Sequence, residues 1–275
     1  MIPTPDTSHV SYDTIYEPSE DSYLFLDTLS SSSESTWLRS RFTTPSPSPL
    51  LLEVGCGSGV VLAFLTANST LILGRRDVLA LATDVNSDAC TATRETVTRA
   101  VEDRQQQEEE PTESVSRTGE GDEPKSVCLA TVTGDLATPL RPGTVDVLLF
   151  NPPYVPTDDV PGLPPAAAAT SPLGSVTIAE LSKSDKFERD SYYLSLTYAG
   201  GRDGMEITDR FLDAIPESLD PIRGVAYVLL CAQNRPEEVK ARIRGWGEGW
   251  RAETVGRSGM QAGWEKLVIV RIWRE

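Results

Sequence analysis

The run Asn151-Pro152-Pro153-Tyr154 combines residue types that could hold a planar nitrogen group for a reaction. Such a nitrogen is a poor nucleophile, because its lone pair is delocalised into the neighbouring π system. The Asn151 side-chain oxygen and the Pro152 carbonyl can each accept an N–H hydrogen bond, and prolines fix φ near about −65°, which holds the acceptors in place. Tyr154 can stack on the planar group. An ordinary Pro-Pro turn is the alternative for this tetrapeptide taken alone.

A loop near the start of the chain is suited to binding a nucleoside. Glu53 stands two residues before the first glycine of Gly55-Cys56-Gly57-Ser58-Gly59. Glycines permit positive φ and let the backbone approach a ligand closely at the positive end of a following helix. The spacing G-x-G-x-G differs from the G-x-G-x-x-G of nicotinamide enzymes, which favours a nucleoside without a pyrophosphate.

Two further acids each follow an apolar run. Asp84 comes after the run 78–82, about where the ribose-binding acid of a doubly wound fold is found, and we expect it to accept both ribose hydroxyls. Asp135 follows the run 127–133 and could face the adenine amine. A role as helix cap is the alternative for either acid taken alone.

The order of these residues predicts the fold, because each of them follows a segment that has the pattern of a buried strand. The carboxyl ends of strands in an open α/β sheet are where such proteins bind ligands. About seven strands are expected, over the segments 50–54, 78–82, 127–133, 145–150, 224–231, 251–256 and 266–273. Helical patterns alternate with several of them. The sequence therefore predicts an α/β fold of three layers, with helices on both faces of a mostly parallel sheet and an antiparallel final hairpin.

We expect one domain over residues 1–275, with three segments outside the sheet. A helical segment at about 12–49 precedes the first strand. A low-complexity acidic tract at about 102–125 cannot bury enough apolar surface to fold, so we expect a disordered insertion there. The loop at about 157–189 follows the tetrapeptide directly, and it is either a lid or a tolerated loop expansion.

Composition excludes several classes of protein. The formal net charge is −16, and the acidic tract accounts for nine acids and three bases, so the remainder still carries −10, which argues against a protein that grips nucleic acid through many phosphates. The four cysteines are far apart and the chain has one histidine, so we expect reduced cysteines and no metal site. No secretory signal or membrane-span pattern is evident, so we expect a cytoplasmic protein, with the nucleus as a second compartment open to it.

Four motifs together resemble the HemK family of protein glutamine methyltransferases, and its eukaryotic branch in particular. They are Tyr16-Glu17-Pro18-Ser19-Glu20-Asp21, the loop that begins with Leu52-Glu53-Val54, the Asn-Pro-Pro-Tyr run, and Gly200-Gly201-Arg202-Asp203-Gly204. The resemblance extends over most of the chain, from residue 12 to residue 272. It implies the fold of class I S-adenosylmethionine-dependent methyltransferases, with seven strands.

The resemblance also implies an activity and a set of site residues. Members of this branch methylate the glutamine of the Gly-Gly-Gln motif in the class I translation termination factor, also called the release factor, with S-adenosyl-L-methionine as cofactor. The catalytic residues carried over are Asn151, Pro152, Pro153 and Tyr154. The cofactor-binding residues carried over are Ser22, Glu53, Gly55, Gly57, Asp84, Asp135, Leu136 and Asn151.

A partner is implied as well. Relatives in this branch associate with a small zinc-binding activator subunit that serves several methyltransferases. The strand expected at 127–133 lies at a sheet edge in this fold, and Val127, Leu129, Ala130 and Val132 make the edge apolar. Because an unpaired edge invites strand addition, we expect a heterodimer through it. An edge shielded by the chain's own acidic tract is the alternative.

Three other functions are open to the same residues. Methylation of the adenine exocyclic amine in DNA uses the Asn-Pro-Pro-Tyr run by the same logic, but the missing basic surface speaks against it. Histone lysine methylation is a second alternative, although an ammonium group must first be deprotonated and gains little from Asn151. A noncatalytic scaffold is the third, and the presence of Glu53, Asp84 and Asn151 speaks against it.

Overall fold

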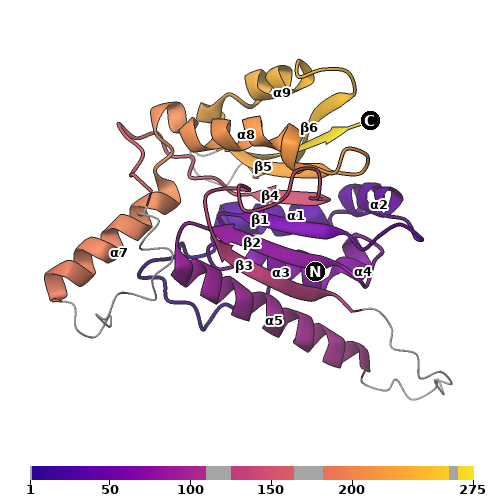
Figure 1. The fold of residues 1–275 in the computed structure, drawn as a ribbon, viewed down its shortest axis with the longest axis horizontal. Coiled ribbons are helices and arrows are strands. Elements are labelled where there is room, and N and C mark those ends of the chain that lie inside the picture. Colours follow the sequence, from indigo (N-terminus) through magenta and orange to yellow (C-terminus); the bar gives the residue numbers. More distant parts are fainter. Residues whose placement is uncertain (1, 110–124, 164–181, 260–265) are drawn as a thin grey trace.

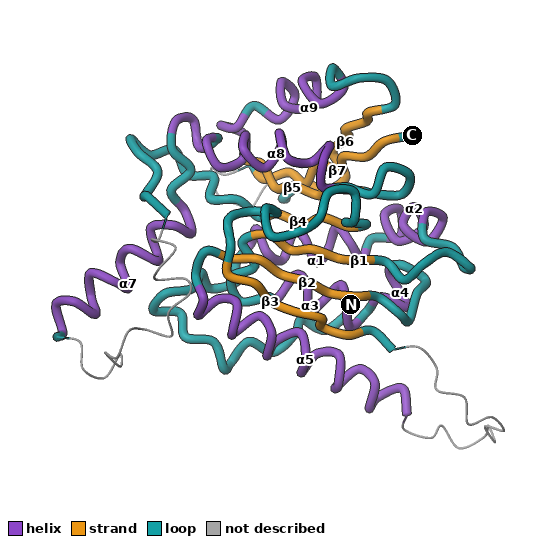
Figure 2. Tube along the Cα trace, viewed as in Figure 1, coloured by secondary structure: helices purple, strands orange, loops and turns teal. Residues whose placement is uncertain are grey.

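We describe residues 2–109, 125–163, 182–259 and 266–275 of a computed structural model. Helices flank a central sheet on both faces (Figures 1 and 2). The strands are β1 (Leu50–Val54), β2 (Leu79–Asp84), β3 (Val127–Thr133), β4 (Val147–Phe150), β5 (Val225–Cys231), β6 (Trp250–Arg257) and β7 (Leu267–Arg274). The α-helices are α1 (Glu20–Ser30), α2 (Ser32–Arg41), α3 (Val60–Ala67), α4 (Ser69–Ile72), α5 (Ser87–Glu109), α7 (Lys183–Tyr198), α8 (Glu206–Ser218) and α9 (Pro236–Arg244). Two short 3-10 helices are η2 (Arg202–Gly204) and η3 (Ala232–Asn234).

The seven strands form one sheet in the order β3-β2-β1-β4-β5-β7-β6. Strands β1 to β5 pair in parallel, and β7 runs antiparallel to both β5 and β6. This confirms the expected mostly parallel sheet with an antiparallel final hairpin. It is the fold of class I S-adenosylmethionine-dependent methyltransferases. The strand order reverses between β1 and β4, which is where ligands bind in open α/β sheets.

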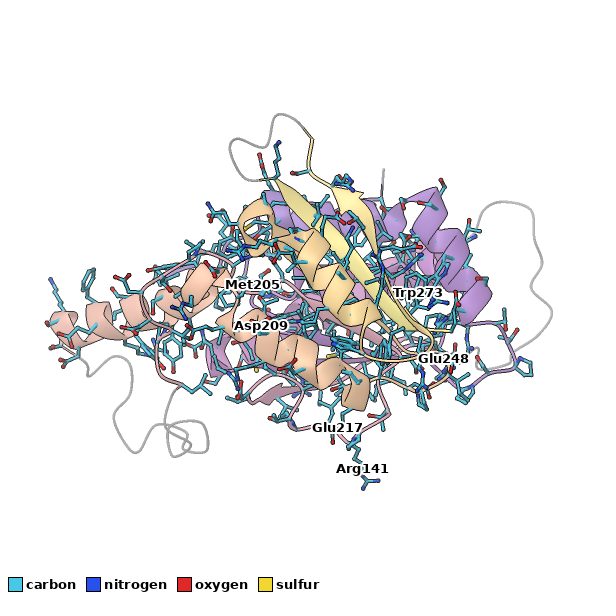
Figure 3. All side chains as sticks on the ribbon, turned by 90° about the horizontal axis from the view of Figure 1, so that it is seen from above. Arg141, Met205, Asp209, Glu217, Glu248 and Trp273 are labelled. Carbon is cyan, nitrogen blue, oxygen red and sulfur yellow. The ribbon has the colours of Figure 1, made fainter. Side chains whose placement is uncertain are left out.

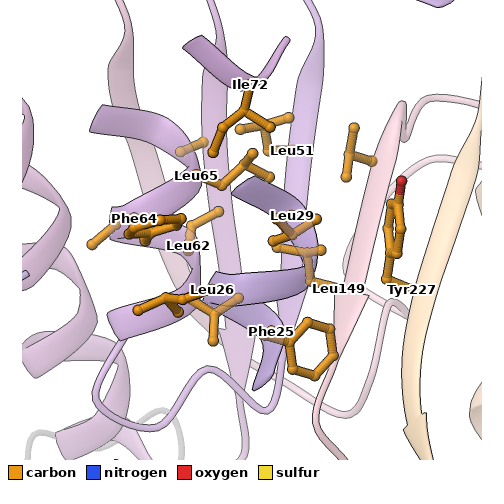
Figure 4. Close-up of a cluster of buried hydrophobic side chains, with 14 of the residues drawn as sticks. Phe25, Leu26, Leu29, Leu51, Leu62, Phe64, Leu65, Ile72, Leu149 and Tyr227 are labelled. Carbon is orange, nitrogen blue, oxygen red and sulfur yellow. The ribbon is translucent and has the colours of Figure 1, made fainter. Parts of the chain in front are cut away.

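Alternation of side chains along the strands divides the core into two layers. In β5, Tyr227 and Leu229 face the layer of α1, α3 and α5, whereas Val228 and Leu230 face the layer of α8 and α9. Figure 4 shows the first layer, where Phe25 and Leu29 of α1 and Leu62 and Leu65 of α3 lie near Leu51, Leu149 and Tyr227 of the sheet. Every residue of β5 is buried, as expected for a central strand covered on both faces.

Helix α8 has a clearly amphipathic pattern, and it covers the second face of the sheet. Phe211, Leu212 and Ile215 are buried against the strands. Phe211 packs on Phe150 at the end of β4, with 4.5 Å between the ring centroids. Figure 3 shows α8 from above, running from Met205 at its N-terminus past Asp209 to Glu217 near its C-terminus. The contact between the two rings fixes the end of β4, where the Asn-Pro-Pro-Tyr run begins.

The segment before α1 packs across the N-terminal part of α5. Val10 and Ile15 are buried in a small cluster with Ala89 and Ala92. The Asn86 side chain donates to the Thr14 carbonyl at 2.9 Å. The N-terminal segment is thereby brought to the carboxyl ends of the strands. Of the helices in the described residues, none is long and apolar enough to cross a membrane.

Two expected boundaries were wrong. The tract expected to be disordered at about 102–125 begins inside α5, which continues to Glu109. Most of the residues 102–109 are Glu, Arg and Gln, which are good helix formers that need no burial when they extend an existing helix. The loop expected at 157–189 contains the start of α7, at Lys183. Residues 110–124 and 164–181 of these two segments lie outside the described residues.

Candidate active site

A cavity of about 340 Å³ lies at the carboxyl ends of β1, β2 and β4. Every residue carried over from the family pattern lines it: Ser22, Glu53, Gly55, Gly57, Asp84, Asp135, Leu136, Asn151, Pro152, Pro153 and Tyr154. They come from five separate segments of the chain. The structure therefore brings the predicted site residues together, while their individual roles stay predictions.

The glycine loop after β1 adopts the backbone conformation that its glycines permit. Gly55, Gly57 and Gly59 all have positive φ, at 61°, 51° and 76°. A Cβ on Gly59 would lie 2.7 Å from the Thr93 Cα, so a side chain there would push the loop away from α5. The loop leads directly into α3, whose N-terminus faces the cavity through Val60 and Val61.

Glu53 is buried beneath this loop and caps helix α3. Its Oε2 accepts the Leu62 backbone N–H at 3.0 Å, which satisfies one of the unpaired donors in the first turn of α3. Burial raises the pKa of Glu53 to about 8, although the Leu62 hydrogen bond opposes the shift. The nearby Asp84 carboxylate raises it further. The hydrogen bond from the Leu62 backbone therefore holds the Glu53 side chain at the wall of the cavity.

Asp84 is fixed by backbone donors on both oxygens. Its Oδ2 accepts the Gly57 N–H at 3.1 Å, and its Oδ1 accepts the Asn86 N–H at 2.8 Å. Burial raises its pKa, against these two hydrogen bonds, which lower it. Each carboxylate oxygen keeps a second lone pair, so the position remains compatible with the predicted ribose contact.

Asp135 also lines the cavity and forms an ion pair with Arg210 of α8. Leu136, which follows it, has φ of 52°, a left-handed conformation that is uncommon for a leucine. This conformation turns the chain sharply after β3 and places both residues at the cavity. Arg210 is the one basic side chain among the described residues that line the cavity, against the four acids Asp21, Glu53, Asp84 and Asp135.

The Asn151 amide is oriented by Asp21. The Asn151 Nδ2 donates to the Asp21 Oδ2 at 3.1 Å, although the two residues are 130 positions apart. A carboxylate oxygen accepts hydrogen bonds, so this contact places the amide nitrogen toward α1 and the amide oxygen toward the cavity. Among the described residues, the buried Asn151 Oδ1 has no hydrogen-bond partner. An unsatisfied buried acceptor beside a cavity is the feature expected of an atom that binds a ligand donor.

The Gly-Gly-Arg-Asp-Gly motif supports the backbone of the Asn-Pro-Pro-Tyr run. A Cβ on Gly200 would lie 2.4 Å from the Pro153 carbonyl oxygen, and one on Gly204 would lie 2.1 Å from the Tyr154 carbonyl oxygen. The Asn234 side chain donates to the Gly204 carbonyl at 3.3 Å and the Asp203 carbonyl at 3.1 Å, fixing the motif from the other side. The N-cap residue of α8 is Met205, which makes no side-chain cap.

Three contributions to the site were missed at the level of sequence. Asp21 was not among the predicted site residues, although its place in the motif 16–21 was a signal. Arg210 lies inside an ordinary amphipathic helix and carries no sequence signal. The cavity also contains Tyr193 and Leu196 of α7, a helix that had not been expected.

Within the ranges that the structure describes, no group of His, Cys, Asp and Glu side chains could hold a metal ion. The four cysteines are free. The expectations of reduced cysteines and of no metal site concerned these types of side chain.

The sequence was compared with known proteins. No protein-family model matches it. Methyltransferase HEMK2 of Mus musculus is 31% identical over 277 residues, which cover 98% of this chain and 96% of the relative. The chain belongs to the HEMK2 family of methyltransferases. Methyltransferase HEMK2 of Homo sapiens is 30% identical over 86% of this chain and 82% of that protein. The eRF1 methyltransferase catalytic subunit mtq2 of Schizosaccharomyces pombe is 28% identical over 100% of this chain and 96% of its own length.

The cavity fits S-adenosylmethionine, the cofactor of this fold. Gly55 and Gly57 line the cavity without a side chain, and the carboxylates of Asp84 and Asp135 line it with acceptor capacity left. The excess of acids over bases in the lining favours a ligand that carries a positively charged sulfur. The residues predicted to hold the methyl donor therefore line one cavity in this chain.

Proposed function

We propose that this chain methylates the side-chain amide nitrogen of a glutamine, in the Gly-Gly-Gln motif of the class I translation termination factor. The observation that carries the proposal is the buried Asn151 Oδ1 that has no partner among the described residues, beside the Pro152 carbonyl. A primary amide has two N–H donors in one plane, and these two acceptors can receive both. The name of the fission yeast relative, which specifies eRF1, supports this choice of substrate protein.

The chain's own residues would perform three tasks. Glu53, Asp84 and Asp135 hold the methyl donor, whose chemistry when bound is an electrophilic methyl group on a positively charged sulfur. Asp21 fixes the Asn151 amide, so that its oxygen and the Pro152 carbonyl hold the acceptor nitrogen in line with the methyl group. Tyr154 lies against the plane of the acceptor amide. Orientation of the two reactants supplies most of the acceleration.

The step itself needs no strong base. The bound methyl donor would supply the methyl group, so that the N–C bond would form as the S–C bond breaks and its electron pair would remain on sulfur. Hydrogen bonds from the amide protons to the two acceptors weaken conjugation of the nitrogen lone pair. The surplus proton leaves for water once the nitrogen has begun to bond.

The same contacts favour a neutral amide over a lysine ammonium. The Asp21 Oδ2 receives Asn151, and the Asp21 Oδ1 receives the Ser22 backbone N–H at 2.6 Å. The Asp21 carboxylate therefore already accepts hydrogen bonds from the chain itself and is not directed at an incoming cation. An ammonium group held at Asn151 would meet two neutral acceptors, and the carboxylate beside them already receives donors from the chain itself.

The substitution Asn151→Ala tests the assignment. It removes the acceptor without removing any of the acids, so we expect cofactor affinity within about threefold of the wild type and a loss of at least about 100-fold in kcat. Calorimetric titration with the cofactor and radiolabelled methyl incorporation measure the two quantities. Methyl transfer at the wild-type rate would refute the role of Asn151.

We also propose that a small zinc-binding activator subunit adds to the edge strand β3. In the described part of the chain, β3 pairs with β2 on one side and has no strand on the other. Val127 is 41% exposed and Leu129 51% exposed along that edge, which is unusual for large apolar side chains in a strand. Apolar side chains beside unpaired backbone groups are what strand addition by a partner requires.

Co-expression with the activator subunit tests the heterodimer. The substitution Leu129→Asp should abolish co-purification, since it places a charge in the centre of the interface. Leu71→Asp is a matched control, because Leu71 is similarly exposed but belongs to helix α4 and not to the edge strand. Undiminished co-purification with Leu129→Asp would exclude β3 as the interface and leave shielding by the chain's own acidic tract as the alternative.

A further inference from the structure

The cavity extends beyond the residues that serve the cofactor and the Asn-Pro-Pro-Tyr run. The remaining part of its lining, called the outer half below, includes Val155, Val160 and Leu163 together with Tyr193, Leu196 and Thr197 of α7. Positions 193, 196 and 197 follow one another on a single face of a helix. The described residues of this outer half, which belong to the segments 152–163 and 193–199, carry no charge, whereas the acids line the inner half.

Helix α7 is attached to the molecule mainly at the rim of this cavity. None of its sixteen side chains is buried. Arg189 forms an ion pair with Asp88 at the N-terminus of α5, and its guanidinium lies 5.3 Å from the centre of the Tyr193 ring. The Tyr192 hydroxyl donates to the Gly162 carbonyl at 2.6 Å. In Figure 1, the N-terminal half of α7 extends away from the body of the molecule, while its C-terminal half leads back to α8.

Backbone contacts join the end of α7 to the residues after the Asn-Pro-Pro-Tyr run. The Val155 N–H donates to the Tyr198 carbonyl at 3.0 Å, and the Gly200 N–H donates to the Val155 carbonyl at 2.8 Å. The position of Tyr193 and Leu196 is therefore tied to the same backbone that places Asn151 and Pro152. Helix α7 has no buried side chain, and its C-terminal end is hydrogen-bonded to the backbone that follows the Asn-Pro-Pro-Tyr run. It is therefore suited to contact a substrate that binds to this run.

We propose that the Tyr193 and Leu196 face of α7 is the substrate-specificity wall of this enzyme, and that it contacts an uncharged, extended segment of the substrate protein on either side of the acceptor glutamine. The inference rests on the proposed function. The occupant is argued from two observations: the wall is continuous with the Asn151 site, and it offers apolar and aromatic side chains with no charge to pair. Small, uncharged flanking residues would leave these side chains in contact with the peptide backbone.

Steady-state kinetics with the class I termination factor as substrate test the wall. For Tyr193→Ala and Leu196→Ala, we expect KM for the protein substrate to rise about tenfold or more, with kcat changed less than about threefold. The dissociation constant of the cofactor, measured by calorimetry, should change less than about twofold. Tyr193→Phe should restore the wild-type KM, because it keeps the ring that forms the contact.

Phe187→Ala is the matched control. Phe187 lies on the same helix and is 73% exposed, and it is absent from the cavity lining. Its removal should leave KM unchanged. If Phe187→Ala raised KM as much as Tyr193→Ala does, the removal of an aromatic side chain anywhere on α7 would be enough to raise KM. That result would overturn the inference.

Two results separate failure of the inference from failure of the proposed function. A wild-type chain that methylates the termination factor with KM unaffected by either substitution would overturn the wall alone. A wild-type chain that methylates no glutamine, although it binds the cofactor, would overturn the proposed function and the wall with it. A loss of cofactor affinity equal to the rise in KM would also contradict the wall, since α7 would then serve the donor half of the cavity.

Discussion

At the scale of single residues, the direction of the Asn151 amide depends on Asp21. The carboxylate of Asp21 is buried and receives four donors, which are the Asn151 Nδ2, the Ser22 backbone N–H, and the Ser19 and Ser22 hydroxyls. Without an acceptor at this position, the amide could turn by half a rotation and present its N–H group to the acceptor nitrogen. Two donors would then face each other in the reactive position.

The substitution Asp21→Asn should therefore lower methyl transfer more than cofactor binding. We expect kcat to fall about 10-fold to 100-fold, with the cofactor dissociation constant within about threefold of the wild type. Asp27→Asn on the same helix is the control, because Asp27 is exposed and far from the cavity lining. Equal losses in affinity and in kcat would show that Asp21 serves the cofactor, and the positioning role would be wrong.

Glu53 links the site to pH. Burial raises its pKa in the folded chain from 4.5 to about 8, so between these values the folded state keeps a proton that the unfolded state has lost. The stability contributed by this group is present below about pH 4.5 and is lost as the pH rises to about 8. Asp84 is shifted in the same direction by burial.

The substitution Glu53→Gln should change the unfolding free energy, relative to the wild type, more favourably at pH 8 than at pH 5. Glutamine keeps an acceptor for the Leu62 N–H and cannot lose a proton. We expect the difference in unfolding free energy between variant and wild type to change by about 1–4 kcal/mol over this range, in favour of the variant as the pH rises. Urea denaturation at several pH values measures it, and Asp84→Asn measured in parallel separates the two carboxylates. A difference that does not vary with pH would contradict the raised pKa.

The acids at the ends of strands could be placed from sequence, because a polar residue that follows an apolar run marks the end of a strand. The contacts of Asp21 with Asn151 and of Arg210 with Asp135 could not. Each joins residues far apart in the chain, at 130 and 75 positions, and tertiary packing alone decides which side chains meet.

At the scale of elements, the Gly200 to Gly204 motif functions as a support for the reactive loop. Gly204 has φ of 68° and lies too close to the Tyr154 carbonyl to accept a side chain. The same turn leads into α8, whose Phe211 packs on Phe150 at the start of the loop. The reactive run is thereby held from both ends by one stretch of chain.

Gly204→Ala should destabilise the fold and displace the loop. The left-handed backbone and the contact at 2.1 Å together predict a loss of about 2–4 kcal/mol in unfolding free energy. Gly259→Ala is the control, since a Cβ there would meet nothing within 4 Å. Denaturant titration gives the comparison, and equal stability of the two variants would show that the motif does not support the loop.

Most strands were predictable because they carry the run of apolar residues that a covered sheet requires, whereas β6 at the sheet edge alternates between buried and exposed residues in its first half. Helix α7 and the end of α5 were not predictable, for a common reason. Both have low hydrophobicity, and their residues are favourable in a helix as well as in a solvated loop, so the pattern of apolar side chains does not distinguish the two states. The Pro-containing sequence before α7 further favoured a loop interpretation.

At the scale of the whole molecule, the negative charge of the chain favours a protein substrate over a nucleic acid. The chain carries a net charge of −16, and the cavity lining of the described residues holds four acids and one base. Binding to a polyanion would require the release of counterions from many basic contacts, which this chain does not offer.

Titration with an unmethylated DNA duplex tests this conclusion. We expect no transfer of a labelled methyl group to adenine, and no binding tighter than about 10⁻⁴ M at physiological salt, the weak end of non-specific association. The termination factor, assayed beside the duplex, is the positive control. Methylated adenine above the background of Asn151→Ala would revive the DNA alternative.

The central claim is that this site holds a neutral amide for methylation. The most direct measurement is mass-spectrometric mapping of the recombinant termination factor after reaction with the wild-type chain, co-expressed with the proposed activator subunit, and the methyl donor. The substrate is assayed with its Gly-Gly-Gln motif intact and with the glutamine replaced by lysine. We predict one methyl group on the glutamine side chain and none on the lysine form. Methylation of the lysine form at a rate equal to or above that of the glutamine form would contradict the account.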